Sequence, residues 1–180
     1  MKKDKKLIVF VCRGNIHRSP IGEQVLKKLL KERGLEDKFE VISRGISGTA
    51  GTKPPEYKNI LGYPEELKAS KPTLRKLNID ITKHEARPIT EDIVKKAVAI
   101  IAMDKYVHFY LPHSLVNQFP LYKNKIHLLT QLEGKNQDIP DCRGFEDPEF
   151  HRAVIERIYN VLNNHFDTLM EWTKETTQNY

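Results

Sequence analysis

The sequence predicts an α/β fold in which helices cover both faces of a parallel β-sheet. Short runs of apolar and β-branched residues, typical of buried strands, alternate with longer segments whose apolar residues recur at helical spacing. This alternation favours a parallel sheet, because each parallel connection needs a crossover long enough to hold a helix. The length of 180 residues fits one domain with a sizeable core. We therefore expect a single domain over residues 1–180.

The first strand and the first helix are predicted close to the N-terminus. The run L-I-V-F-V at residues 7–11 predicts a buried strand, and apolar residues then recur at helical spacing until Gly34. Ser19 is a favourable N-cap and Pro20 suits the first helical position, so we expect the helix to begin there. Residues 1–6 carry four lysines and are expected to form a basic, solvated tail.

The remaining elements follow in order along the chain. Apolar runs predict three further strands, at residues 39–43, 98–102 and 126–129. Helical periodicity and start signals predict further helices at residues 65–77, 90–96, 105–111 and 150–174. Pro72 is expected to break the first of these helices, with Ser70 capping the second piece.

The segment from Cys12 to Arg18 joins the end of the first strand to the start of the first helix. Backbone N–H groups of a tight loop can converge on one oxyanion there, and the helix N-terminus adds partial positive charge. Gly14 is expected to permit the turn, and Arg18 can form two parallel hydrogen bonds to a phosphate. The same positive field favours the thiolate form of Cys12, which would then face a bound phosphoryl group as an in-line nucleophile.

The stretch C-R-G-N-I-H-R-S-P, residues 12–20, resembles the phosphate-binding loop of the low-molecular-weight protein tyrosine phosphatases. Members of that family carry the loop directly after the first strand, as here. The resemblance extends to K-H-E-A-R-P-I-T at 83–90, I-I-A-M-D at 100–104 and F-H-R-A-V at 150–154. Residues 46–71 match poorly and form an atypical insertion where the family carries its aromatic specificity loop.

The resemblance implies a Rossmann-like, four-stranded parallel sheet of the phosphotyrosine phosphatase I type and a protein tyrosine phosphatase activity. Cys12 would attack a phosphotyrosine monoester to form a cysteinyl-phosphate, while Arg18 and the loop amides stabilise the equatorial oxygens. An aspartic acid would protonate the leaving phenolate and later activate water. The implied substrate is a phosphotyrosine protein or a small aryl phosphate, inorganic phosphate is the product, and no cofactor or metal is required.

The same resemblance assigns seven residues to the phosphate-binding loop, namely Arg13, Gly14, Asn15, Ile16, His17, Arg18 and Ser19. Asn15 either tolerates a left-handed backbone or braces the loop through Ser43. The Ser19 hydroxyl is expected to donate to the Cys12 thiolate. A bulky aliphatic residue such as Ile16 accompanies tyrosine phosphatases in the family, whereas threonine accompanies bacterial arginine phosphatases.

Other residues near these motifs have open or structural roles. His17 replaces a second cysteine that can protect the nucleophile as a disulfide, and it is either a protonated support for the thiolate or a solvent-facing spacer. His84 is expected to be a structural histidine that holds the loop. Tyr57 and Tyr63 either supply an aromatic wall or are ordinary loop residues. Asp104 is expected to cap a helix.

Two aspartates compete for the role of general acid. The family motif is Asp-Pro before the last helix, which literally matches Asp147-Pro148, but Asp147 lies only three residues before Phe150 and suits a helix cap. Asp141 lies nine residues before Phe150, at about the family distance, so we expect Asp141 to be the acid. Cys142 follows it in place of the usual proline and is expected to be an inert, structural thiol.

Composition excludes several classes of function. The formal net charge is +6, but the lysines are scattered and no nucleic-acid-binding motif is present, so no nucleic-acid partner is expected. No stretch is long enough to span a membrane, and the basic start lacks the features of a signal peptide. Cys12 and Cys142 give neither a disulfide framework nor metal-ligand spacing, which indicates a reducing, cytoplasmic setting.

Two alternative functions share the loop. An arsenate reductase of the same fold passes electrons through two further cysteines, whereas only Cys142 follows Cys12 here. A non-catalytic module that binds phosphate or phosphotyrosine would also keep the loop geometry. The combination of Cys12, Arg18, Ser19 and an aspartate favours an enzyme over such a module.

Overall fold

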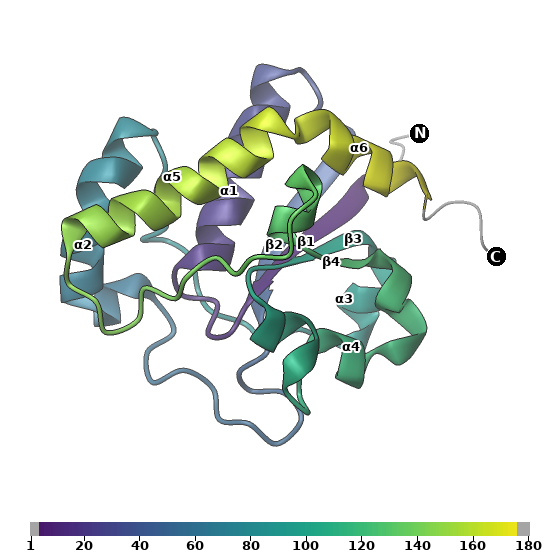
Figure 1. Cartoon of the computed structure of the whole chain (residues 1–180), viewed down its shortest axis with the longest axis horizontal. Helices are drawn as coiled ribbons and strands as arrows, with labels where there is room; N and C mark the ends of the chain where they lie inside the picture. The colour runs from purple at the N-terminus through teal and green to yellow at the C-terminus, as the bar shows by residue number, and fades with distance from the viewer. Residues whose placement is uncertain (1–3, 176–180) are drawn as a thin grey trace.

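The computed structural model describes residues 4–175 and contains a four-stranded parallel sheet in the order β2-β1-β3-β4 (Figure 1). The fold class predicted from the sequence is therefore confirmed. The strands are β1 (Lys6–Cys12), β2 (Phe39–Gly45), β3 (Ala97–Ala102) and β4 (Ile126–Leu128). Lys6 is thus the first residue of β1 and not part of a tail, while residues 1–3 of the expected basic tail lie outside the described residues.

The strand order places a topological switch point at the carboxyl end of β1. The chain leaves β1 for β2 on one side and later returns to β3 on the other, so the two connections diverge there. Cys12 pairs in register with Gly45 of β2, and Val11 pairs with Ala102 of β3. The ends of three strands therefore meet where the loop after Cys12 begins.

Helices cover both faces of the sheet (Figure 1). One face carries α1 (Arg18–Glu32), α2 (Pro64–Lys76), α5 (Pro148–Asn164) and α6 (Phe166–Glu175), and the other carries α3 (Glu91–Lys96) and α4 (Leu115–Gln118). Alternate residues of β1 divide between two buried clusters, with Phe10 on the first face and Val11 on the second. Within residues 4–175, none of the helices is long and apolar enough to cross a lipid bilayer.

Short helical turns complete the chain. They are the 3₁₀ helices η1 (Ile60–Gly62), η3 (Pro120–Lys125) and η4 (Leu129–Glu133) and the π-helical turn η2 (Tyr106–Tyr110). The helix expected at residues 105–111 is therefore this single π-helical turn.

Helix α2 runs through Pro72 without a break, so the expected break is wrong. Ser70 does not cap a second piece, because it lies fully buried within α2 and its hydroxyl donates to the Glu66 carbonyl at 2.8 Å. The buried face of α2 packs against α5, which compensates for the hydrogen bond that the proline cannot make.

The long C-terminal helix is divided at His165, whose backbone (φ −119°, ψ 29°) ends α5 before α6 begins. The sequence pattern predicted one continuous helix because the apolar positions keep their spacing through Phe166 and Leu169. The division lets α5 pack on α1 and α2 while α6 turns to pack against β3.

Candidate active site

Cys12 ends β1 with its sulfur enclosed by residues 13–19, the predicted phosphate-binding loop. The Asn15 N–H donates to Cys12 Sγ at 3.2 Å, and Ser19 Oγ lies 3.0 Å from the same sulfur. Helix α1 begins at Arg18 and not at Pro20, so Ser19 lies in the first turn and is not the N-cap. In this position the Ser19 hydroxyl still lies against the Cys12 sulfur, and a hydrogen-bond donor there can stabilise a thiolate.

Asn15 both turns the loop and braces it. Its φ of 57° is left-handed, and its side-chain Nδ2 donates to Ser19 Oγ at 2.9 Å and to Ser43 Oγ at 3.0 Å. The expectation that Gly14 makes the turn is wrong, because its φ is not positive and an added Cβ would make only ordinary contacts. The glycine that the loop requires is Gly45, where a Cβ would lie 3.0 Å from the Arg13 carbonyl oxygen.

A second layer of hydrogen bonds holds this brace. Ser43 Oγ donates to the buried Glu23 carboxylate at 2.7 Å, and the Arg87 N–H donates to Asn15 Oδ1 at 3.0 Å. His84 Nε2 lies 3.1 Å from both the carbonyl oxygen and Oδ1 of Asn15. Burial lowers the pKa of His84 although Glu23 opposes the shift, so the neutral ring donates from Nε2 and fixes the loop.

Arg18 is buried and held by two carboxylates. Nη1 donates to Asp104 Oδ2 at 2.5 Å and to the Ile139 carbonyl at 2.8 Å, while Nη2 lies 3.2 Å from Asp141 Oδ2. Burial alone would lower the pKa of Arg18, but the negative charges of Cys12, Asp141 and Asp104 raise it. The guanidinium therefore stays charged at the mouth of the loop.

Asp104 has a role in the site that sequence reasoning missed. As expected it acts as a cap, since Oδ1 accepts from the Val107 N–H at 2.8 Å, but Oδ2 binds Arg18. Its position could have signalled this second role, because Asp104 follows the carboxyl end of β3 directly beside β1.

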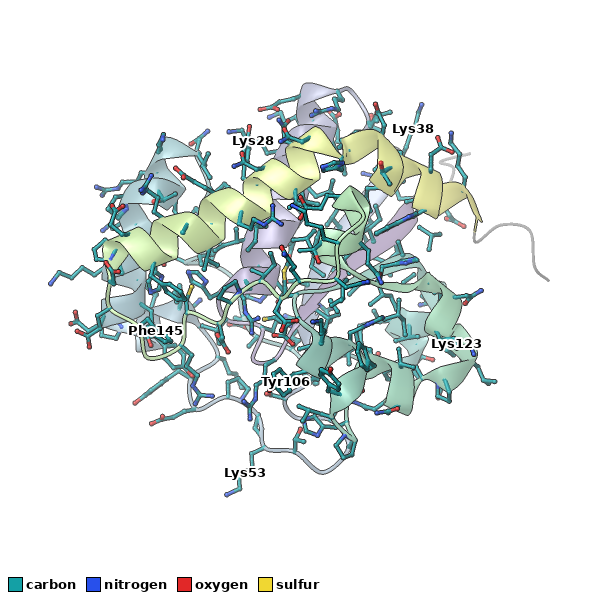
Figure 2. All side chains as sticks on the ribbon, in the orientation of Figure 1. Lys28, Lys38, Lys53, Tyr106, Lys123 and Phe145 are labelled. Atoms are coloured by element: carbon teal, nitrogen blue, oxygen red, sulfur yellow. The ribbon has the colours of Figure 1, made fainter. Side chains whose placement is uncertain are left out.

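The two candidate acids occupy different places. Asp141 lines the same pocket as Cys12, and its side chain is 46% exposed. Asp147 is the N-cap of α5 and accepts from the Glu149 N–H at 3.0 Å, as its spacing predicted. In Figure 2, the labelled Phe145 marks the segment before α5 that carries both aspartates. Only Asp141 of the two borders the pocket.

The pocket above Cys12 has one apolar wall and a charged rim. Ile16 comes from the loop, and the 46–71 segment supplies further wall residues, namely Pro55, Ile60 and Tyr63. Tyr57 does not line the pocket but packs edge-on against Tyr63, with ring centroids 5.4 Å apart. Glu66, Asp141 and Arg143 form the polar side. An aromatic ring can therefore stack beside the loop while its phosphate sits inside it.

Both expectations for His17 are wrong, because the residue is buried and neutral. Burial, together with the charges of His151 and Arg18, lowers the pKa of His17 to about 3. Its Nε2 lies 2.7 Å from Ser70 Oγ. Cys142 is buried as well, and burial raises the pKa of its thiol to about 12.

A cluster that the sequence spacing did not indicate lies beside the loop. One ring nitrogen each of His17 and His151 and the Cys142 sulfur lie within 4.8 Å of one another. The three residues come from different segments of the chain, so no local motif signals their meeting.

The fold and the loop define the class of protein, because a Cys-x5-Arg loop lies between β1 and α1 at the carboxyl edge of a parallel sheet. The model of the family described as "Low molecular weight phosphotyrosine protein phosphatase" matches residues 7–178, and the chain belongs to that family. Its members are phosphoric monoester hydrolases, and this chain is one of them.

Known relatives agree with this assignment. The low-molecular-weight phosphotyrosine protein phosphatase of Homo sapiens is 30% identical over 155 residues, which cover 86% of this chain and 87% of the relative. The crystal structure of the corresponding phosphatase from T. tengcongensis superposes with a TM-score of 0.70 at 26% identity, covering 93% of this chain and 99% of the other. The YwlE arginine phosphatase from Geobacillus stearothermophilus shares the fold at 23% identity, with a TM-score of 0.67 and coverage of 97% and 99%.

The hydrogen bonds that join Asn15, Ser43 and Glu23, here called the brace, predict that removing one member lowers both stability and activity. In Ser43→Ala, Asn15 and the buried Glu23 each lose a partner, so the free energy of unfolding should fall by about 1–3 kcal/mol. The displaced loop should lower kcat/KM for an aryl phosphate by about 10-fold or more. Urea unfolding and steady-state kinetics measure the two effects. Ser47→Ala, in the same segment but outside the brace, is the control, and equal behaviour of the two variants would contradict the bracing role.

Proposed function

We propose that the protein hydrolyses phosphotyrosine monoesters, in proteins or as small aryl phosphates, and releases inorganic phosphate in the cytoplasm. The observation that carries the proposal is the convergence of Cys12, Arg18 and Asp141 on one pocket with an apolar wall at Ile16 and Tyr63. Both cysteines are free thiols, in keeping with a reducing compartment.

In the first step, the Cys12 thiolate attacks phosphorus in line with the leaving oxygen. An S–P bond forms, the P–O bond to the phenol breaks, and the phenolate oxygen takes a proton from the Asp141 carboxylic acid. The Asp141 contact with Arg18 Nη2 is exchanged for a phosphate oxygen, while Asp104 keeps its bond to Nη1. Arg18 and the loop amides then stabilise charge on the equatorial oxygens, and this stabilisation lowers the barrier more than any other single interaction.

In the second step, the Asp141 carboxylate takes a proton from water as the water oxygen attacks phosphorus. The S–P bond breaks and Cys12 departs as a thiolate, to which the Ser19 hydroxyl, 3.0 Å away, can donate. The products are inorganic phosphate and the regenerated thiolate, so no external electron donor is needed.

The wall of the pocket distinguishes this proposal from the alternatives. An aromatic and aliphatic surface at Tyr63, Ile60 and Ile16 suits a phenyl ring better than a guanidinium group. Arsenate reduction through two further cysteines is not supported, because the sequence contains only Cys12 and Cys142.

Hydrolysis assays test the reaction and the substrate class together. The wild type should hydrolyse a phosphotyrosine peptide with a higher kcat/KM than a phosphoarginine peptide. Cys12→Ser should lose more than about 100-fold in kcat but still bind phosphate, because the loop amides and Arg18 remain. Residual turnover above that limit would exclude Cys12 as nucleophile, and a preference for phosphoarginine would overturn the substrate class.

The dependence of the hydrolysis rate on the acidity of the leaving phenol shows which of the two aspartates is the general acid. A phenol with a pKa of about 10 leaves poorly without a proton, so Asp141→Asn should slow phenyl phosphate hydrolysis by about 100-fold or more. The same variant should slow hydrolysis of an aryl phosphate with a strongly acidic phenol much less. Asp147→Asn, the matched control, removes the α5 cap and should lower stability by about 1 kcal/mol while leaving-group dependence stays normal. The reverse pattern would assign the acid to Asp147.

A further inference from the structure

Three buried side chains from separate segments meet beside the phosphate-binding loop. His17 precedes α1, Cys142 lies on the loop of residues 139–147, hereafter the acid loop, and His151 lies in the first turn of α5. Their exposed fractions are 8%, 1% and 0%, and one potential ligand atom from each lies within 4.8 Å of the others. The proposed hydrolysis uses none of the three.

The hydrogen bonds leave each imidazole with a lone pair. His151 Nε2 lies 2.7 Å from the Phe145 carbonyl and must donate to it, so in the neutral form of the ring Nδ1 carries the lone pair. The single Ser70 hydroxyl proton is shared between two acceptors, His151 Nδ1 at 2.7 Å and the Glu66 carbonyl at 2.8 Å. His17 Nε2, 2.7 Å from the same hydroxyl, is therefore the donor in that pair.

The remaining nitrogen of His17 is an unsatisfied buried acceptor. Nδ1 has no hydrogen-bond partner within residues 4–175, although the side chain is more than nine-tenths buried. A buried nitrogen without a partner is costly in a native structure and calls for an explanation. One ring nitrogen of His17, one of His151 and the Cys142 sulfur lie within 4.8 Å of one another, so a metal ion is a ligand that this cluster could hold.

We propose that His17, Cys142 and His151 bind one divalent zinc ion. Two imidazole nitrogens and one thiolate are ligands that Zn²⁺ prefers, with bonds of about 2.0 Å to nitrogen and about 2.3 Å to sulfur. The ligand atoms now lie within 4.8 Å of one another, so metal binding would require side-chain rotations that bring them closer together. His17 and Cys142 also border the pocket, so a water molecule can complete four ligands. Coordination removes the thiol proton of Cys142, and each ion bound therefore releases one proton.

The ion would connect the acid loop to the phosphate-binding loop and to α5. Asp141 is the neighbour of Cys142 in sequence, so metal binding would restrict the acid loop. The effect of the metal on catalysis rests on the proposed function, whereas the binding of the metal does not. The site would thus regulate the position of the general acid without entering the reaction.

Cobalt is a suitable probe, because Co²⁺ replaces Zn²⁺ at such sites and absorbs through its bond to a thiolate. The full chain contains two cysteines, so Cys12→Ser leaves Cys142 as the only thiol and removes the competing catalytic sulfur. Titration of Cys12→Ser with Co²⁺ should give thiolate-to-cobalt absorption that saturates at about one equivalent, and Zn²⁺ should abolish it. Equilibrium dialysis measures the affinity independently.

Matched variants in the Cys12→Ser background locate the ion. Adding Cys142→Ser, a conservative change, should remove the absorption and weaken Co²⁺ binding by at least about 10-fold. Adding His151→Gln should weaken binding likewise, whereas His165→Asn at the far end of α5 should not. Near-UV circular dichroism verifies that each variant is folded. Undiminished Co²⁺ affinity after Cys142→Ser, or no absorption in Cys12→Ser, would overturn the proposal.

Hydrogen exchange tests the effect on the acid loop without any assay of activity. Zn²⁺ should slow amide exchange in residues 142–147 of Cys12→Ser and leave the Cys12→Ser/Cys142→Ser variant unchanged. Equal exchange with and without Zn²⁺ in Cys12→Ser would contradict the proposed connection. Because neither measurement involves turnover, failure here and failure of the phosphatase assays remain distinguishable.

Discussion

A buried guanidinium at Arg18 is the constraint on which the site depends. A charge taken out of water is tolerated only when it is paired and hydrogen-bonded, and Arg18 is only 3% exposed. Its partners come from the end of β3, through Asp104, and from the acid loop, through Ile139 and Asp141. Satisfying one charge therefore brings the first loop, the third strand and the acid loop into a single arrangement around Cys12.

The hydrogen bonds beneath the loop impose a similar constraint, because they join buried polar side chains to the Glu23 carboxylate. Ser19, Asn15 and Ser43 are fully buried, and each has a hydrogen-bond partner within the network that ends at Glu23. Such a network is stabilising only when all of its members are satisfied, which makes the loop rigid before any phosphate arrives. In the proposed reaction, such a loop would present its amides to the phosphate already in place, and preorganisation of this kind is the main source of electrostatic catalysis.

Local patterns predicted the parts of the structure that depend on local chemistry. Apolar runs located the four strands, and the Cys-x5-Arg spacing predicted the loop that lines the pocket. Asp147 was recognisable as a cap because capping depends on residues that are adjacent in sequence. Asn15 was predicted either to adopt a left-handed backbone or to brace the loop through Ser43, and it does both. The turn was wrongly expected at Gly14, whose φ is not positive. The burial of His17 against Ser70 and His151 also escaped prediction, because only tertiary packing brings those residues together.

The central claim is that Cys12 carries the phosphoryl group during turnover, and trapping that intermediate tests it most directly. Asp141→Asn should be mixed with an aryl phosphate whose phenol is strongly acidic, quenched in acid within the first turnover and digested for mass spectrometry. The account predicts one phosphoryl group on the Cys12 peptide, which accumulates because the second step lacks its base. The same peptide from a matched Cys12→Ser/Asp141→Asn sample should carry none on this timescale. Phosphate found on His17, or phenol released in a burst without modification of Cys12, would contradict it.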